Sequence, residues 1–328
     1  MSEGRAGAER LIARITANAP VSAGLLRLDL ELTHPVDFEP GQFTMLNLLG
    51  DRELVFGRPF SILAADGPQV SVLYRVVGRG TALMAELRRG ERMTFLGPLG
   101  RPFPAPGELP ALLLAGGVGL PPLYAWWRRY ARPGDVACFG ARDGADVPWS
   151  LLDGWNVSVE APSRLPAGRD GFVGLVTDLA RDLAAQPPPG SPQPLPGSPQ
   201  PLPGSPQPLS GAPQPAPGTP QPAPGTLPSL TGWRLLACGP MPLLRAVARW
   251  AQETGWPCLV SVEEHMGCGY GVCKGCVVPL RDPRADSLPL ADRPFRPATS
   301  CEVGPVFAAE QIDWELFGRS SVSSGGDP

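Results

Sequence analysis

The sequence predicts an α/β plus β protein with three consecutive units: an antiparallel β-barrel, a parallel α/β domain and a small C-terminal module built around cysteines. Three observations predict this order. Short strands with period-two alternation fill the first hundred residues, a buried strand runs into a glycine loop and a helix near residue 111, and four spaced cysteines lie between residues 268 and 301. With 328 residues, 43% of them hydrophobic, the chain is long enough to bury separate cores.

The barrel is predicted over residues 8–104. Residues 26–32 alternate apolar and polar side chains, and residues 41–48 and 69–77 resemble partly buried strands. Many short strands with little helix favour a closed antiparallel barrel. Residues 80–87 follow as a helix, for which Thr81 is the predicted N-cap. A helix start of this kind presents free N–H groups to a phosphate.

Residues 58–61 read Arg-Pro-Phe-Ser and form a candidate ligand-binding strand. The planar fork of Arg58 can grip a pyrophosphate, Phe60 or Tyr74 can lie against an aromatic ring, and Ser61 can donate a hydrogen bond to it. Considered singly, these residues are explained as well by core packing of Phe60 and a solvated turn at Arg58.

A dinucleotide-binding α/β domain is predicted over residues 108–256. The apolar run 111–115 leads into Gly116-Gly117-Val118-Gly119 and then a helix, which together form a phosphate cradle. Further strands end near residues 140–143 and 235–238, so polar residues follow strand carboxyl ends, where open α/β sheets bind ligands. A helix after Pro242 is expected to close at Gly255. This order is Rossmann-like.

A proline-rich insertion, residues 186–230, interrupts this domain before its last predicted strand. It carries no charged residue and holds 18 of the chain's 44 prolines, so we predict a disordered surface insertion whose deletion is tolerated. A ligand for proline-binding domains is the alternative.

The C-terminal module is predicted over residues 257–312. Its thiols are spaced C-x4-C-x2-C with a distant fourth, which matches a plant-type [2Fe–2S] ligand set made of Cys268, Cys273, Cys276 and Cys301. A zinc ribbon is the alternative, although zinc loops prefer two C-x2-C pairs, and disulfides are a weaker one. Met266, Tyr270 and Val272 are predicted either to dock a partner or to shield the cluster. Cys138 and Cys258 are interpreted as small buried hydrophobes.

Composition excludes other classes of function. A formal charge of −3 and a pI near 5.6, with no basic stripe, argue against nucleic acid. No segment approaches the roughly 20 apolar residues of a membrane span, and the start lacks an apolar signal core, so we expect a soluble, cytoplasmic protein.

These motifs in this order resemble the ferredoxin–NADP reductase superfamily, and within it the family of electron-transfer subunits of class 1B dihydroorotate dehydrogenase. The marks are Pro40-Gly41-Gln42-Phe43, residues 58–61, Gly78-Arg79-Gly80-Thr81, Gly97-Pro98-Leu99-Gly100, the glycine loop, Cys238-Gly239-Pro240-Met241, and the tail from Glu263 with Gly304-Pro305-Val306-Phe307.

The resemblance implies three sets of site residues. FAD would be bound by Arg58, Pro59, Phe60, Ser61, Leu73, Tyr74, Arg75, Gly80 and Thr81. NAD would be seated by Gly116, Gly117, Gly119, Cys238 and Gly239, and the four cysteines named above would hold the cluster. No residue is expected to act as a catalytic acid or base. Segment 100–103 and the insertion depart from the family pattern and put the NAD site in doubt.

The implied function is electron transfer in de novo pyrimidine biosynthesis. Electrons would pass from the FMN of a separate dihydroorotate dehydrogenase catalytic subunit, in a heterotetramer, through the cluster and FAD to NAD+. Two alternatives stay open: a reductase subunit serving ferredoxin or hydrogenase, and a zinc-bearing interaction protein. The choice of NAD against NADP is also open, because Arg142 could contact a ribose phosphate and Asp143 could oppose one.

Overall fold

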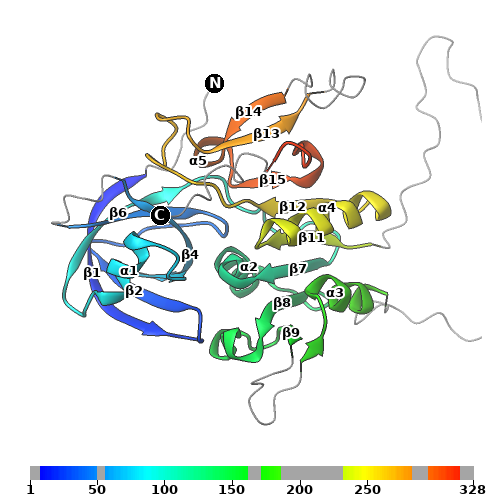
Figure 1. The fold of residues 1–328 in the computed structure, drawn as a ribbon, viewed down its shortest axis with the longest axis horizontal. Coiled ribbons are helices and arrows are strands. Elements are labelled where there is room, and N and C mark those ends of the chain that lie inside the picture. Colours follow the sequence, from blue (N-terminus) through cyan, green and yellow to red (C-terminus); the bar gives the residue numbers. More distant parts are fainter. Residues whose placement is uncertain (1–7, 50–55, 162–170, 186–231, 283–294, 318–328) are drawn as a thin grey trace, which may run out of the picture.

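The computed structural model describes residues 8–49, 56–161, 171–185, 232–282 and 295–317. The predicted insertion, 186–230, lies outside these residues. A barrel, an α/β sheet with helices on both faces and a C-terminal module lie against one another (Figure 1). No helix in the described ranges is long and apolar enough to cross a membrane.

The barrel confirms the prediction for the first unit. Six strands close in the order β1-β2-β5-β4-β3-β6, and every neighbouring pair is antiparallel. Alternate residues point inward; Leu28, Leu30 and Phe95, for example, are fully buried in its core. The strands are β1 (Glu9–Pro20), β2 (Leu26–Leu32), β3 (Phe43–Leu48), β4 (Arg58–Asp66), β5 (Gln69–Tyr74) and β6 (Arg92–Leu99).

Helix α1 (Arg79–Glu86) corrects one prediction. Its N-cap is Gly78, not Thr81, which lies inside the first turn at the third helical position. The Thr81 hydroxyl accepts hydrogen bonds from the backbone N–H groups of Val77 (2.9 Å) and Gly78 (3.2 Å). Thr81 therefore caps the N-terminus of α1 from the third helical position, as the side chain at that position of a capping box does.

The α/β sheet has seven strands in the order β10-β9-β8-β7-β11-β12-β15, all parallel except the antiparallel edge strand β15. Prolines in the first turn of α2 and the left-handed Gly255 (φ 71°) that closes α4 fit the predicted helix ends. The strands are β7 (Ala111–Gly116), β8 (Val136–Asp143), β9 (Asn156–Ala161), β10 (Phe172–Val173), β11 (Arg234–Cys238), β12 (Cys258–Ser261) and β15 (Val306–Ala308). The helices are α2 (Leu120–Tyr130), α3 (Val176–Ala184) and α4 (Met241–Thr254).

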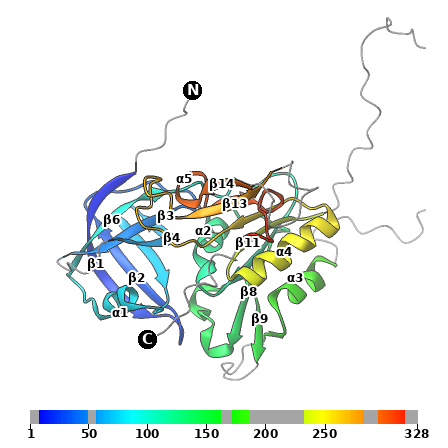
Figure 2. The same ribbon diagram turned by 45° about the horizontal axis from the view of Figure 1, so that its top comes forward.

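Helices cover both faces of this sheet (Figure 2). Helices α3 and α4 pack on one face, where Leu179 and Leu244 share one hydrophobic core with Leu112 and Leu235 of the sheet. Helix α2 packs on the other face, and its core also contains barrel residues. The α/β domain and the barrel therefore share a continuous core across α2.

The C-terminal module is a two-stranded sheet of β13 (Val277–Arg281) and β14 (Phe295–Thr299), followed by α5 (Ser300–Val303). Strands β12 and β15 flank it in sequence and belong to the seven-stranded sheet, so that sheet continues beyond residue 256. Val278 and Ile312 join the core under α4. The limits 8–104, 108–256 and 257–312 stay predictions, but the module is packed firmly on the sheet.

Candidate functional site

The four predicted ligand cysteines come together as two pairs. Cys276 Sγ and Cys301 Sγ are 3.2 Å apart, and the backbone N–H of Cys301 donates to Cys276 Sγ over 3.4 Å. The backbone N–H of Cys273 donates to Cys268 Sγ over 3.4 Å. Cys276 and Cys301 are buried, whereas Cys273 is exposed. One pair thus faces the interior and the other reaches the surface.

Backbone N–H groups of the loop stabilise the thiolate form of Cys268. Burial acts to raise the pKa of Cys268, but hydrogen bonds from the N–H groups of Cys273, Tyr270 and Val272 outweigh it and lower that pKa to about 6. Burial, reinforced by the neighbouring Cys276 sulfur, raises the pKa of Cys301 to about 12. A bound cation would reverse this second effect, because a coordinated thiol loses its proton.

Two glycines of the loop are required by geometry. Gly269 (φ 80°) and Gly271 (φ 90°) have left-handed backbones. A Cβ on Gly269 would lie 2.4 Å from Cγ of Met45, and one on Gly271 would lie 2.9 Å from the carboxyl carbon of Glu302. The loop is therefore seated closely on barrel strand β3 and on α5.

Glu302 is a site residue that sequence reasoning missed. Its Oε2 accepts from Lys274 Nζ at 2.7 Å and from Thr299 Oγ1 at 2.8 Å, so it ties the ligand loop to the segment that carries Cys301. The available signal was a lysine between Cys273 and Cys276 and an acid next to Cys301.

An exposed apolar surface surrounds this loop, formed by Phe56, Tyr270 and Val272, with exposed fractions of 56%, 50% and 73%. A Cβ on Gly267 would lie 3.9 Å from the Phe56 ring, so this side chain from the barrel adjoins the ligand loop. Met266, in contrast, packs on the small core that contains Cys276 and Cys301.

The structure brings the predicted flavin residues together around β4, the end of β5 and the start of α1. A Cβ on Gly80 would lie 2.3 Å from Arg58 Nε, so the guanidinium covers the first turn of α1. Pro59, Phe60 and Ser61 follow on β4 and are half-buried. Gly80 and Thr81 are buried at the helix start.

Tyr74 and Leu73 lie deeper than a ligand-stacking position. Tyr74 is 1% exposed, its hydroxyl donates to Asn18 Oδ1 at 2.9 Å, and burial raises its pKa. Its ring meets Phe60 edge-on, with centroids 6.0 Å apart. Leu73 packs into the core shared with α2. Phe60 therefore offers the accessible aromatic face, with Tyr74 supporting it from behind.

The predicted dinucleotide residues meet at the carboxyl ends of β7 and β11, which are neighbouring parallel strands. A Cβ on Gly119 would lie 2.3 Å from the carbonyl oxygen of Cys238, and one on Gly116 would lie 3.1 Å from Pro240 Cδ. Gly117 (φ 55°) and Gly239 (φ 154°) have backbones that favour glycine. This is the edge at which open α/β sheets bind nucleotides.

Arg75 and Glu263 place a positive and a negative charge at the same edge. Arg75 Nη2 lies 3.9 Å from the position of a Cβ on Gly117. Glu263 is an exposed residue at this edge; partial desolvation raises the pKa of its carboxyl, and the positive charge of Arg75 opposes that rise. Burial and the nearby Glu263 carboxylate raise the pKa of Cys238. Glu263 belongs to the tail motif of the sequence, but no feature of its sequence context indicates this position.

Residues 100–103, the segment that departs from the family pattern, contact the C-terminal module. The backbone N–H of Arg101 donates to the carbonyl of Gly304 at 2.5 Å, and Arg101 forms a bridge with Pro305. The contacts of Arg101 place residues 100–103 against the module rather than in the glycine loop.

At the end of β8, Asp143 Oδ1 accepts a hydrogen bond from the Ala145 N–H at 2.8 Å, and Arg142 is exposed.

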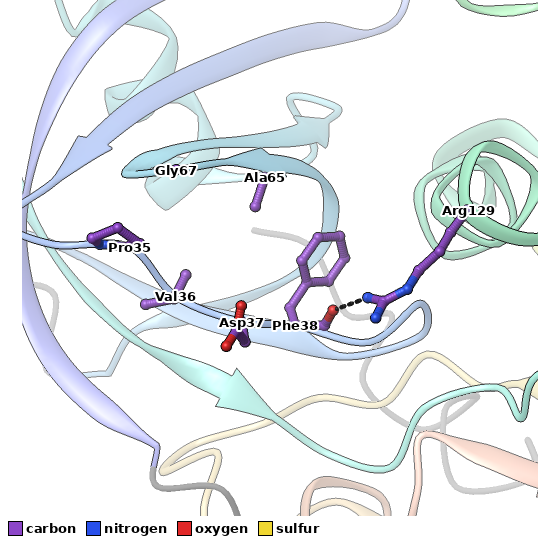
Figure 3. A pocket seen from close by; sticks show the side chains of 7 residues that line it. All are labelled: Pro35, Val36, Asp37, Phe38, Ala65, Gly67 and Arg129. Atoms are coloured by element: carbon purple, nitrogen blue, oxygen red, sulfur yellow. Dashed lines mark hydrogen bonds between the residues drawn. The ribbon is translucent and has the colours of Figure 1, made fainter.

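A shallow pocket at the joint between the barrel and α2 is separate from these residues (Figure 3). Arg129 Nη1 donates to the Phe38 carbonyl at 2.8 Å, and Nη2 pairs with Glu39 Oε1 at 2.9 Å. The guanidinium is thus used to join the two units. The lining residues are Pro35, Val36, Asp37, Phe38, Ala65, Gly67 and Arg129.

Comparison with known proteins assigns the family. The model of the iron–sulfur cluster binding domain of dihydroorotate dehydrogenase B matches residues 263–313. The chain is 30% identical over 285 residues to the dihydroorotate dehydrogenase B (NAD(+)) electron transfer subunit of Bacillus velezensis, covering 84% of this chain and 87% of that protein. The chain belongs to this family. The corresponding subunit of Geobacillus kaustophilus is 28% identical over 311 residues, or 93% of this chain and 95% of that protein.

The family assignment confirms the predicted resemblance, and solved structures agree with the fold. A structure of an NADH-dependent reduced ferredoxin-NADP oxidoreductase matches 92% of this chain and 90% of that chain with a TM-score of 0.64 at 19% identity. A ferredoxin reductase of carbazole 1,9a-dioxygenase matches 76% and 67%, with a TM-score of 0.54. At these identities the likeness concerns the fold alone.

The four cysteines of this chain fit an iron–sulfur cluster, the group for which the matched family domain is named. Four thiols are grouped within one module and receive backbone N–H groups, as thiolate ligands of clusters do. Cys138 and Cys258 are instead isolated in β8 and β12, where burial raises each thiol's pKa to about 12. They are small buried side chains, as predicted.

Proposed function

We propose that this chain carries electrons between the FMN of a dihydroorotate dehydrogenase catalytic subunit and NAD+, by way of a [2Fe–2S] cluster and FAD. As a member of the dihydroorotate dehydrogenase B electron-transfer family, it is an oxidoreductase subunit of pyrimidine biosynthesis. The observation that carries the proposal is the seating of the four-cysteine loop directly on the barrel strand next to Arg58 to Ser61.

The order of centres follows from electron counts. A nicotinamide exchanges two electrons as a hydride, an iron–sulfur cluster exchanges one, and a flavin does both, so FAD belongs between the other two. The protein's own part is to hold and orient these groups and to keep water out. We assign no acid or base to the chain.

The pairing of cysteines supports the [2Fe–2S] type. In such a cluster each iron takes two thiolates, so Cys268 with Cys273 would hold one iron and Cys276 with Cys301 the other. A single zinc ion would instead draw all four sulfurs to one point.

For FAD, we propose that Arg58 binds the pyrophosphate beside the N–H groups of Gly80 and Thr81, and that Phe60 and Ser61 contact the ring system. Pro59 stiffens the strand, and Leu73 and Tyr74 form the floor of the site. Arg75 lies beyond that floor, facing Gly117, so we place it where FAD and the dinucleotide meet.

For NAD, we propose that Gly116, Gly117 and Gly119 cradle the pyrophosphate while Cys238 and Gly239 border the nicotinamide. The names of the relatives specify NAD(+). Asp143 stands at the strand end where an acidic residue favours an unphosphorylated ribose, which supports NAD over NADP.

For the partner, we propose that the catalytic subunit covers the exposed surface formed by Phe56, Tyr270 and Val272. Large apolar side chains gathered around the exposed Cys273 are typical of an interface core. Two copies of each subunit, a heterotetramer in the cytoplasm, complete the proposal.

The test is anaerobic purification of the chain with and without the catalytic subunit. We expect bound FAD, two irons and two acid-labile sulfides per chain, flavin reduction by NADH, and orotate-dependent NADH oxidation only in the complex. Cys273→Ser should abolish the cluster while FAD stays bound, and Cys258→Ser is the matched control that keeps the iron. Colourless protein with one zinc per chain would overturn the proposal.

A further inference from the structure

Strand β3 lies between the predicted flavin strand β4 and strand β6 in the barrel, and it also supports the cluster loop. On one side β3 pairs with β4, with Phe43 opposite Ser61 and Met45 opposite Pro59. Directly opposite residues of an antiparallel pair share a face, with Cβ atoms about 5 Å apart. Met45 therefore stands beside Pro59 on the face of β4 that Ser61 also occupies.

The Met45 side chain also contacts the cluster loop. A Cβ on Gly269 would lie 2.4 Å from Met45 Cγ and 2.7 Å from its Sδ, so the loop backbone rests on this side chain. Met45 is 1% exposed and lies in one small core with Phe43, Leu99, Cys276 and Cys301. Two ligand cysteines are thus packed in the same cluster of side chains.

An irregularity in the sheet accompanies this placement. The pairing of β3 with β6 shifts register between Phe43 and Met45, and Thr44 Oγ1 donates to the Leu96 carbonyl at 3.0 Å within the shift. Bulges of this kind commonly re-aim side chains next to functional sites. Leu46, the next residue, points into the barrel core, so Met45 is directed outward to the loop.

We propose that Met45 is the positioning residue that sets the separation of cluster and flavin, by filling the space between Pro59 and Gly269. This inference rests on the proposed function. With both groups bound, electrons would pass one at a time from the reduced flavin to the cluster, which takes up a single electron before passing it on, and the proton that the flavin carries at N5 would go to solvent. The rate of such a transfer falls exponentially with the distance between the two groups, so a side chain that fixes the distance controls the rate.

The experiment is anaerobic stopped-flow reduction of the holoprotein by NADH, which resolves flavin reduction from the later reduction of the cluster. In Met45→Ala we expect unchanged flavin reduction, while electron passage to the cluster slows on the order of tenfold. Met45→Leu keeps most of the volume and should restore the rate. Met93→Ala, which removes an equally buried methionine inside the barrel, is the matched control and should leave the transfer unchanged.

Two readouts do not depend on electron flow. A chelator should remove iron faster from Met45→Ala than from Met93→Ala, because the loop has lost its support. Gly269→Ala should accelerate the loss of iron to the chelator less in the Met45→Ala background than in the wild type, because the side chain that the new Cβ would collide with is gone. Should Met45→Ala fail to retain iron, Met45→Val is judged by the same rates.

The outcomes separate the two proposals. Wild-type protein that binds neither flavin nor iron refutes the proposed function. Wild-type protein that binds both, together with a Met45→Ala variant whose transfer rate and iron retention equal those of Met93→Ala, refutes the role of Met45 alone.

Discussion

The Gly119→Ala substitution tests the packing of the glycine loop on β11. The added Cβ would lie 2.3 Å from the carbonyl oxygen of Cys238, 2.4 Å from its carbonyl carbon and 2.5 Å from the nitrogen of Gly239. All three are backbone atoms of a buried strand end, so no side chain can rotate away. The loop, the strand end or both must move.

The size of the effect follows from two opposing contributions. The φ of Gly119 is −77°, which alanine adopts without strain, so the loss of chain entropy in the unfolded state would favour alanine by about 0.4–1 kcal/mol. Overpacking a rigid site costs about 1–3 kcal/mol, and contacts this short with backbone belong at the upper end. We expect a net loss of about 2 kcal/mol in the free energy of unfolding.

The assay is urea unfolding followed by tryptophan fluorescence, with NADH affinity measured in parallel. Trp126 is fully buried on α2, the helix that starts directly after Gly119, and reports on this region. NADH should bind more weakly, because the substitution displaces the loop that we propose to cradle the pyrophosphate.

Gly107→Ala is the control, since a Cβ there would meet only Arg234 Nη1 at 3.8 Å, and its effect should stay within about 0.5 kcal/mol. A Gly119→Ala protein as stable as the Gly107→Ala protein, with NADH affinity intact, would refute the close packing described for this loop.

Four further outcomes are expected. Gly80→Ala should weaken FAD binding, measured by flavin fluorescence, with little change in unfolding, because its Cβ displaces only the flexible end of Arg58; equal FAD affinity would contradict the site. Cys258→Ser should cost about 1–3 kcal/mol by burying a hydroxyl in an apolar strand, yet iron content should equal that of the wild type. Desolvation raises the pKa of Glu263 above its ordinary 4.5, but the residue is exposed and solvent screens the effect; in unfolding at a series of pH values, Glu263→Gln should therefore change stability by less than about 0.5 kcal/mol at every pH, and a gain that grows with pH would argue against it. Replacing residues 186–231 by a short Gly-Ser linker should leave flavin reduction by NADH and the melting temperature unchanged; loss of either would assign the segment a structural role.

Local patterns made much of the fold predictable. The alternation of residues 26–32 matches β2 in both bounds, because a strand with one buried face must alternate. The spacing of the cysteines identified the loop, since ligands of one compact group must be close in sequence or brought back by a single return. Thr81 was misplaced because a threonine hydroxyl can close a helix from either side of its first turn, and the sequence does not distinguish the two.

Long-range contacts could not be predicted in this way. Strand β15 has three residues, Val306–Ala308, and becomes a strand only by pairing with β12. The contact of Met45 with Gly269 joins segments far apart in sequence, and neither residue is unusual in its local context. Glu263 likewise gains its significance from Arg75 and Cys238, which lie on other elements.

The position of β11 has a consequence for how this chain can change. Strand β11 begins at Arg234, whereas the residues that we propose to border the nicotinamide begin at Cys238. Five residues of strand span roughly 15 Å, so the connection joins the sheet at the rim opposite to the chemistry. Length can be gained or lost there over generations without disturbing hydride exchange, which makes that rim a natural place to graft a tag, a tether or a foreign domain.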